Sequence, residues 1–211
     1  MPGACRARRG TMLQIESLRT PFVGPVSLTV ADGECVAIQG PSGAGKSLLM
    51  RAIVDLDPNE GDVWLGTLSR NAMPAHEWRR RVALVPAESG WWSDQVADHF
   101  EPGAETDALL RAVGLPDALG WTVARLSSGE RHRLAIVRAL IASPDAILLD
   151  EPTASLDEAA TTLVEDLVKK KCQRGAAVIV VTHDRAQPER LSARRFLMED
   201  GHLSPSAEDV T

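Results

Sequence analysis

The chain has 211 residues, 44% of them hydrophobic and 25% charged, which is ordinary for a globular domain with one core and a small inserted subdomain. Its net charge of −6 argues against a nucleic-acid-binding role, and no apolar run approaches the roughly 18 residues that span a bilayer. Three widely spaced cysteines, Cys5, Cys35 and Cys172, form no metal-binding or disulfide pattern and indicate a reducing compartment.

The chain opens with the basic stretch MPGACRARRG, and no apolar segment follows it, so a secretory signal is not predicted. We expect residues 1–11 to form a disordered tail, with both Met1 and Met12 open as the start of the chain. A single domain is predicted over residues 12–205.

Apolar patterning predicts five strands, of which the later ones are apolar throughout, as strands buried on both faces should be. In chain order they are Leu13–Leu18, Val26–Val30, Glu34–Gln39, Ala146–Asp150 and Ala176–His183. Between the last two, the segment 155–175 has helical periodicity, an acidic start, a basic end and Gly175 as its C-cap. This β–α–β unit predicts an α/β fold with a parallel sheet. Residues 91–142 lack strand patterns, and a helical subdomain is predicted at about 89–143.

The segment GPSGAGKS at 40–47 fits the pattern G-x-x-x-x-G-K-[ST] and stands between a predicted strand and a helix, the context that this motif needs. Its glycines let backbone N–H groups surround phosphate oxygens at the positive end of the helix. We expect Lys46 to reach the β- and γ-phosphates and Ser47 to bind Mg²⁺. The predicted nucleotide contacts are Gly40, Pro41, Ser42, Gly43, Ala44, Gly45, Lys46, Ser47 and Leu48.

The apolar strand AILLD ends in Asp150 and is followed by Glu151. A carboxylate at the carboxyl edge of the sheet, near a phosphate loop, is the second part of a nucleotide site. Asp150 is therefore predicted to bind Mg²⁺, and Glu151 to polarise an attacking water as general base.

The segment LSSGE at 126–130 resembles the LSGGQ signature of ATP-binding cassette (ABC) proteins, and it stands just upstream of the Asp-Glu strand as in that family. The resemblance continues with SLD at 155–157 and VTHD at 181–184, and it covers residues 13 to about 203. It implies that Asp157 belongs to the D-loop and that His183 is the switch histidine, which senses the γ-phosphate. It also implies that the signature acts in trans, on ATP held by the other subunit. The signature residues are Ser127, Ser128, Gly129 and Glu130.

The same resemblance implies a P-loop NTPase fold with a small antiparallel β layer and an inserted helical subdomain. It implies ATP and Mg²⁺ as cofactors, a homodimer, and integral membrane transporter subunits as partners, with no nucleic acid. The chain would lie in the cytoplasm, bound to the inner face of the membrane through its partner. Two alternatives stay open: a soluble ABC ATPase outside transport, and a nucleotide-binding regulator with impaired hydrolysis.

The sequence departs from the family pattern at three positions. Ser128 replaces a glycine of the signature and Glu130 a glutamine, while Ala87 stands where the family has a glutamine after a strand. Alanine binds neither water nor Mg²⁺. We predict that Glu88 substitutes as a metal ligand, the alternative being a surface glutamate.

Two further features have more than one interpretation. The adenine contact falls on Phe22 by chemistry or on Arg19 and Thr20 by alignment. The adjacent Trp91 and Trp92 cannot both face inward, so they either anchor a membrane partner or divide between core and rim.

Overall fold

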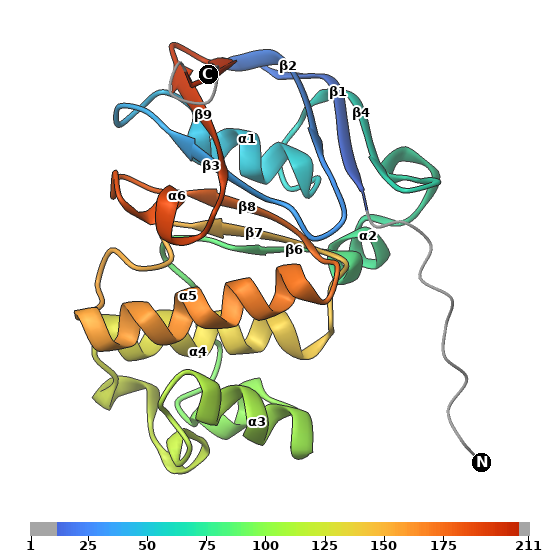
Figure 1. The fold of residues 1–211 in the computed structure, drawn as a ribbon. Helices are drawn as coiled ribbons and strands as arrows, with labels where there is room; N and C mark the ends of the chain where they lie inside the picture. Colours follow the sequence, from blue (N-terminus) through green and yellow to red (C-terminus); the bar gives the residue numbers. More distant parts are fainter. Residues whose placement is uncertain (1–11, 207–211) are drawn as a thin grey trace.

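The computed structural model describes residues 12–206 and arranges them in layers, two of which are β-sheets (Figure 1). The first sheet has six strands in the order β10-β9-β3-β8-β7-β6, parallel except for the β9–β10 pair. Its strands are β3 (Cys35–Gln39), β6 (Val82–Val85), β7 (Ala146–Asp150), β8 (Ala177–Val181), β9 (Arg194–Glu199) and β10 (His202–Pro205). The predicted tail at residues 1–11 lies outside the described residues.

The second sheet is antiparallel and has four strands in the order β2-β1-β4-β5. They are β1 (Leu13–Thr20), β2 (Val23–Val30), β4 (Glu60–Leu65) and β5 (Leu68–Ser69). The helix α1 (Lys46–Ile53) lies between the two sheets, and α2 (Ala75–Arg81) packs at their edge (Figure 1). Buried side chains of both sheets and of α1 form one apolar cluster.

The opposite face of the six-stranded sheet is covered by α4 (Ser128–Ile141) and α5 (Glu158–Gln173), with α3 (Ala104–Ala112) packed beyond α4 (Figure 1). The short helix α6 (Gln187–Arg190) precedes β9. Four short 3₁₀ helices complete the described structure, at Arg70–Ala72, Val96–His99, Ala118–Gly120 and Val123–Arg125. No helix within residues 12–206 is both long enough and apolar enough to cross a membrane.

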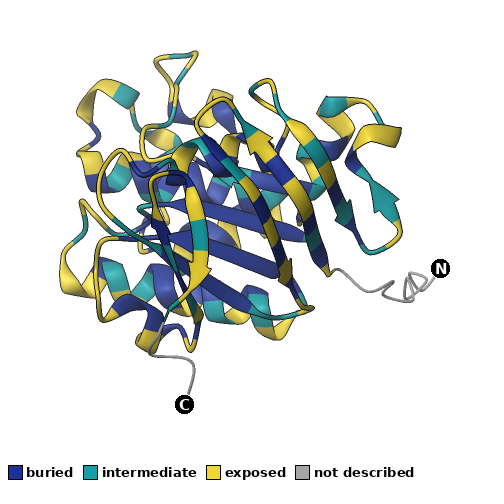
Figure 2. Cartoon of the chain, turned by 90° about the horizontal axis from the view of Figure 1, so that it is seen from above, coloured by how far each residue is buried: buried dark blue, intermediate teal, exposed yellow. Residues whose placement is uncertain are grey.

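The central strands are buried on both faces, which explains their continuous apolar sequence (Figure 2). In β7, Leu148 belongs to the cluster that faces α1, whereas Ile147 and Leu149 belong to the cluster that faces α4 and α5. In β8 the same alternation places Ile179 on one side and Val180 on the other. Period-two side-chain direction therefore joins two separate cores through one sheet.

The five predicted strands are all present, and the α/β prediction is confirmed. Strands β4, β5, β6, β9 and β10 were not among the five predicted strands. The strands β5 and β6 are short, and many residues of the other three are exposed or half-buried. The prediction of Gly175 as C-cap is corrected by one position. Arg174 is the C-cap of α5, and Gly175 follows it in the left-handed conformation at φ 91°.

Candidate active site

The loop between β3 and α1 folds around the side chain of Lys46. The Lys46 Nζ atom donates to the backbone carbonyls of Gly40 and Pro41, both at 2.9 Å, and the side chain is buried. The helix α1 begins at Lys46 and has Gly45 as its N-cap. The first-turn N–H groups of a helix lack intrahelical partners and carry the positive end of the helix dipole. The predicted loop therefore has the form of an anion site.

Two glycines of this loop are required by close approach of the surrounding chain. A Cβ atom on Gly40 would overlap the backbone carbonyl oxygen of Met198, and one on Gly45 would lie 2.5 Å from Val23 Cγ2. Both glycines also have a positive φ, of 146° and 102°. The loop is consequently packed between β9 and the start of β2, which fixes its shape before any phosphate binds.

The two predicted ligands of Mg²⁺ lie side by side. Ser47 Oγ donates to Asp150 Oδ2 at 2.6 Å, which joins the start of α1 to the end of β7. Both groups offer hard oxygen atoms, and the small Mg²⁺ ion is commonly held by one or two such ligands together with phosphates. Within residues 12–206 no group of three or more His, Cys, Asp or Glu side chains could hold a metal ion. The oxygen donors of Ser47 and Asp150 fit a Mg²⁺ ion that nucleotide phosphates also bind.

Glu151 and His183 form a pair at the same edge of the sheet. Glu151 Oε2 accepts a hydrogen bond from the His183 backbone N–H at 3.3 Å, and His183 Nε2 lies 3.3 Å from Glu151 Oε1. Desolvation by burial raises the pKa of Glu151, and the nearby His183 opposes this shift. Glu151 also has a positive φ of 52°, a conformation that is often retained at functional sites.

The signature segment begins the helix α4. Ser127 is the N-cap of α4, and its side chain accepts the Glu130 N–H at 3.2 Å. Glu130 Oε2 in turn accepts the Ser127 N–H at 2.8 Å, which completes a capping box. This backbone hydrogen bond is the main reason that the pKa of Glu130 is lowered. Ser127 and Ser128 are both exposed, so the start of α4 is open to the solvent.

The next residue of the signature packs against the segment that follows β7. A Cβ atom on Gly129 would lie 2.8 Å from the Ser155 carbonyl oxygen and 3.1 Å from Leu156 Cδ2. In the same segment Asp157 is the N-cap of α5, with Oδ1 accepting the Ala160 N–H at 2.8 Å. The signature helix and the segment 155–157 are therefore in contact within one chain.

The resemblance that the motifs suggest agrees with a family comparison. A family model described as "ABC transporter" matches residues 23–154, well over half of the chain. This chain belongs to the ABC transporter family. Its architecture agrees: an ATP-binding subunit of an ABC transporter has a TM-score of 0.81 at 24% identity, over 94% of this chain and 91% of that chain. At this identity the likeness concerns the fold, and it confirms the predicted P-loop NTPase class.

Named relatives are similar along most of the chain. An Fe(3+) ions import ATP-binding protein of Streptomyces coelicolor is 34% identical, over 93% of this chain and 62% of its own length. A probable anion import ATP-binding protein of Haloferax volcanii is also 34% identical, over 95% of this chain and 82% of its own length. The ABC domain described here therefore spans less than two thirds of the first relative and most of the second.

The loop after β6 departs from the ABC pattern in a way that the sequence alone left open. Ala87 and Glu88 are both exposed, and Glu88 stays a prediction as a metal ligand. The ring of His132, on α4, is hydrogen-bonded to the backbone of Ala87. Desolvation lowers the pKa of His132, and its Nε2 atom is buried without a hydrogen-bond partner among the described residues. Sequence reasoning missed this contact. The one local feature that could have drawn attention to His132 is its position between Arg131 and Arg133.

The paired tryptophans do not both face inward, as the sequence predicted. Trp92 is 71% exposed, whereas Trp91 is half-buried against the cluster around α4. The Arg138 guanidinium lies 4.9 Å from the Trp91 ring centroid and 5.1 Å from that of Trp92, within cation–π range. His99 contacts both rings edge-on. Trp92 is thus exposed to the solvent, while Arg138 and His99 contact its ring.

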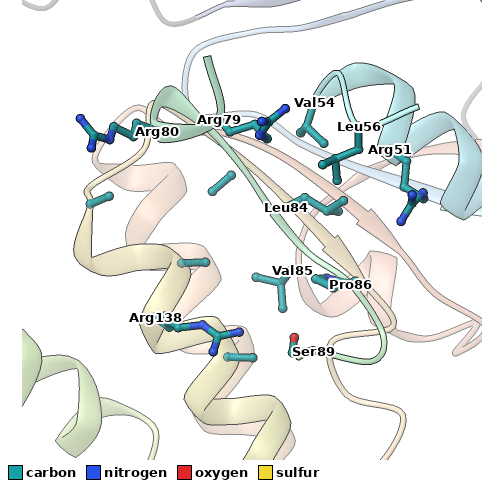
Figure 3. A pocket seen from close by; sticks show the side chains of 14 residues that line it. Arg51, Val54, Leu56, Arg79, Arg80, Leu84, Val85, Pro86, Ser89 and Arg138 are labelled. Carbon is teal, nitrogen blue, oxygen red and sulfur yellow. The ribbon is translucent and has the colours of Figure 1, made fainter. Parts of the chain in front are cut away.

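A cavity of about 340 Å³ lies beside this cluster, between α1, α2, β6 and α4 (Figure 3). Apolar side chains form much of its wall, among them Val54, Leu56, Leu84, Val85 and Pro86. Four arginines also line it, and none of the lining residues, all within the described range, is acidic; the arginines are Arg51, Arg79, Arg80 and Arg138. The cavity is apolar with a positive rim.

The turn between β1 and β2 brings one aromatic residue close to the phosphate loop. Phe22 is 76% exposed, and its backbone oxygen would lie 2.5 Å from a Cβ atom on Gly201. The Gly201 carbonyl accepts from the Gly24 N–H, and the Gly201 N–H donates to the carbonyl of Ala44 in the phosphate loop. Arg19 is instead engaged with Glu60, at 2.8 Å. The structure leaves Phe22 free for a ligand beside the loop.

Ser127 and Ser128 offer a matched test of the helix cap. Ser127→Ala removes the side-chain acceptor of the capping box and should lower the free energy of unfolding by about 1 kcal/mol. Ser128→Ala, at an exposed position, should change it little. Urea unfolding of both variants measures the difference. Equal stabilities would contradict a stabilising cap at Ser127.

Proposed function

We propose that this chain binds ATP with Mg²⁺ and hydrolyses it as a homodimer, to power the movement of a solute through separate integral membrane subunits. The observation that carries the proposal is the gathering of phosphate loop, paired carboxylates and histidine at one edge of the six-stranded sheet. Lys46, Ser47 and Asp150 come from two elements that a 2.6 Å hydrogen bond joins. Glu151 and His183 follow β7 and β8, which are neighbours in that sheet.

Each of these residues has a role that follows from its surroundings. Ser47 and Asp150 would hold Mg²⁺, which supplies neutralisation of phosphate charge during transfer. Lys46 would exchange its two backbone acceptors for phosphate oxygens at little rearrangement of the loop. Glu151 would orient the attacking water and accept its proton, and a raised pKa makes its carboxylate a better base. His183 would bind a γ-phosphate oxygen and couple it to Glu151.

The exposed start of α4 supports hydrolysis by a dimer. Ser127 and Ser128 lie at the positive end of a helix, with Ser127 engaged in its own capping box. In the ABC family this end of the helix closes on ATP held by the other subunit. A phosphate of the second copy would replace Glu130 as the partner of the Ser127 backbone. Gly129 and Asp157 would meet that interface through the contact between the signature helix and the segment 155–157.

The apolar cavity supports docking of a membrane subunit. In ABC transport ATPases this region receives a coupling helix of the membrane subunit. The cavity here combines an apolar wall with arginines, and the exposed Trp92 stands beside it. Such a partner would place the chain at the cytoplasmic face of the membrane. The two relatives described above are named for import of different solutes, as expected when other subunits select the solute.

For adenine we propose a stacking contact with Phe22. The ring is exposed beside the phosphate loop, whereas Arg19 is occupied by Glu60. The resemblance places an aromatic residue at the end of the first strand, and Phe22 follows the end of β1 by two residues.

Replacement of Glu151 tests the chemistry. Glu151→Gln should retain ATP binding and lose hydrolysis about 10²–10⁴-fold, as expected when a general base is removed. Hydrolysis is measured by phosphate release and binding by titration calorimetry, with the exposed Glu189→Gln as control. Burial raises the pKa of Glu151, so its carboxylate becomes protonated at a higher pH than an ordinary glutamate does. As the pH is lowered, the wild-type rate should therefore begin to fall at a higher pH than an ordinary glutamate base would give. A Glu151→Gln variant with more than about half of the wild-type rate would exclude this role.

Replacement of Phe22 tests the adenine contact. Aromatic stacking contributes about 0.5–1.5 kcal/mol, so Phe22→Ala should weaken ATP binding about 2- to 10-fold. Arg19→Ala removes only an exposed ion pair and should bind ATP as the wild type does. Titration of both variants with ATP and with inorganic triphosphate locates the loss, which should appear for ATP alone. A larger loss for Arg19→Ala would assign the adenine contact to the arginine.

Replacement of Trp92 tests the docking surface. Because the indole is 71% exposed, Trp92→Ala should leave the free energy of unfolding and the basal ATPase rate unchanged. In vesicles that contain the membrane subunits, it should weaken the complex by about 2 kcal/mol or more if Trp92 is an anchor. Trp91→Ala should instead lower the stability of the isolated chain, since its ring packs against α4. Full coupling in the Trp92 variant would contradict the docking proposal.

A further inference from the structure

A network of charged and polar side chains lies next to the Glu151–His183 pair, and of its members only Asp184 belongs to a motif discussed above. Its centre is Arg190, at the end of α6. The Arg190 Nη2 atom lies 2.7 Å from Glu165 Oε1 and 2.6 Å from Asp184 Oδ2, while its Nε atom donates to Glu165 Oε2 at 2.9 Å. One guanidinium therefore joins the middle of α5 to the residue that follows His183.

A second side chain extends the network to the other catalytic loop. Gln187 is fully buried, and its Nε2 atom donates to Thr153 Oγ1 at 2.9 Å and to Glu165 Oε1 at 3.1 Å. Thr153 is two residues after Glu151. The loops that carry Glu151 and His183 are thus both tied to Glu165, one through Gln187 and the other through Arg190 and Asp184.

The loop that carries His183 is held at Asp184 by more hydrogen bonds than at the histidine itself. The His183 side chain is 51% exposed, and both its ring and the His183 backbone N–H contact Glu151. Asp184 is bound at several atoms: its backbone N–H donates to Thr182 Oγ1, its carbonyl accepts from Gln39, and its carboxylate binds Arg190. The position of Asp184 therefore determines where the preceding histidine stands.

The network also lines a cavity beside the catalytic pair. A cavity of about 600 Å³ is lined by both catalytic groups and by members of the network. They are Glu151, Thr153, Glu165, His183, Asp184 and Arg190. A shift of the network would change the shape of this cavity as well as the geometry of the pair.

The cost of burying the Glu165 carboxylate explains why a cation lies beside it. The Glu165 side chain is 5% exposed, and a carboxylate at that depth requires a paired cation and hydrogen bonds. Arginine supplies a planar fork that contacts two carboxylates at once, which the single ammonium of lysine does not reproduce. The side-chain hydrogen bond from Arg190 is the main cause of the lowered pKa of Asp184.

We propose that Arg190 is a positioning residue for ATP hydrolysis, which acts by bridging the buried Glu165 to Asp184 and so fixes the loop of His183 against Glu151. Gln187 does the same for the loop of Glu151, through Thr153. This inference rests on the proposed function, because it assumes that Glu151 and His183 take part in hydrolysis. Loss of the bridge leaves the nucleotide site in place and misaligns the catalytic pair.

The sharpest variant is Asp184→Asn, which is isosteric and breaks only one arm of the bridge. It leaves the Arg190–Glu165 pair intact, and Asn Oδ1 can still accept from the Ala186 N–H as Asp184 Oδ1 does. We expect kcat to fall by up to about 100-fold, the cost of a misplaced catalytic group, while KM for ATP and the melting temperature stay near wild type. The exposed Arg185→Gln is the control and should leave kcat unchanged.

A second pair of variants separates positioning from stability. Arg190→Gln should lower both kcat and stability, because it leaves Glu165 buried without its cation. The double variant Glu165→Leu/Arg190→Leu removes both charges and should recover the stability while kcat stays low. Arg190→Lys should give an intermediate kcat.

The outcomes distinguish this inference from the proposed function. A wild-type protein whose hydrolysis does not depend on Glu151 would overturn the proposed function itself. Glu151-dependent hydrolysis with an unchanged kcat in Asp184→Asn would overturn the positioning role alone. Recovery of kcat together with stability in the double leucine variant would likewise assign the network to folding only.

Discussion

The burial of β3, β7 and β8 on both faces is the constraint on which this structure depends. Their side chains alternate between two apolar clusters, so each strand stays apolar along its whole length and polar residues first appear where it ends. Because the three strands are parallel, these ends lie at one edge of the sheet. The phosphate loop, the two carboxylates and the histidine meet there for this reason.

At that edge a few hydrogen bonds fix the relative positions of the site residues. The bond from Ser47 to Asp150 ties α1 to β7, and the contacts between Glu151 and His183 tie the end of β7 to the end of β8. Partial burial raises the pKa of Glu151 without removing it from the cavity. The bridge of Arg190 gives the same loops a support from α5 and α6, on the side away from the phosphates.

The helical layer contributes surfaces that one copy of the chain leaves open. The start of α4 is capped by its own side chains and exposed, while its last turn carries Arg138 against the paired tryptophans. The same helix contacts the loop after β6 through His132 and the segment 155–157 through Gly129. The helix α4 therefore contacts the proposed dimer interface, the proposed docking cavity and the loop of Ala87 and Glu88.

The sequence by itself determined the features that are local. The phosphate loop, the strand that ends in Asp150, the capping box and the exposure of one tryptophan each depend on residues within about one helical turn or one strand, where spacing dictates geometry. Ten residues from Gly40 to Leu49 are enough to specify a glycine-rich turn before a helix. The ABC family and its α/β class follow from such segments in their order along the chain.

Only the tertiary structure decided the contacts between distant segments. Strands β4 and β9 escaped prediction because partial exposure blurs their pattern, and they exist through pairing with β1 and β3. The contact of His132 with Ala87 and the bridge from Glu165 to Arg190 join residues separated by 45 and 25 positions. Sequence periodicity does not predict such pairs, because they form only when the packing of the two cores brings their elements together. A buried charge then pairs with the oppositely charged side chain that lies near it.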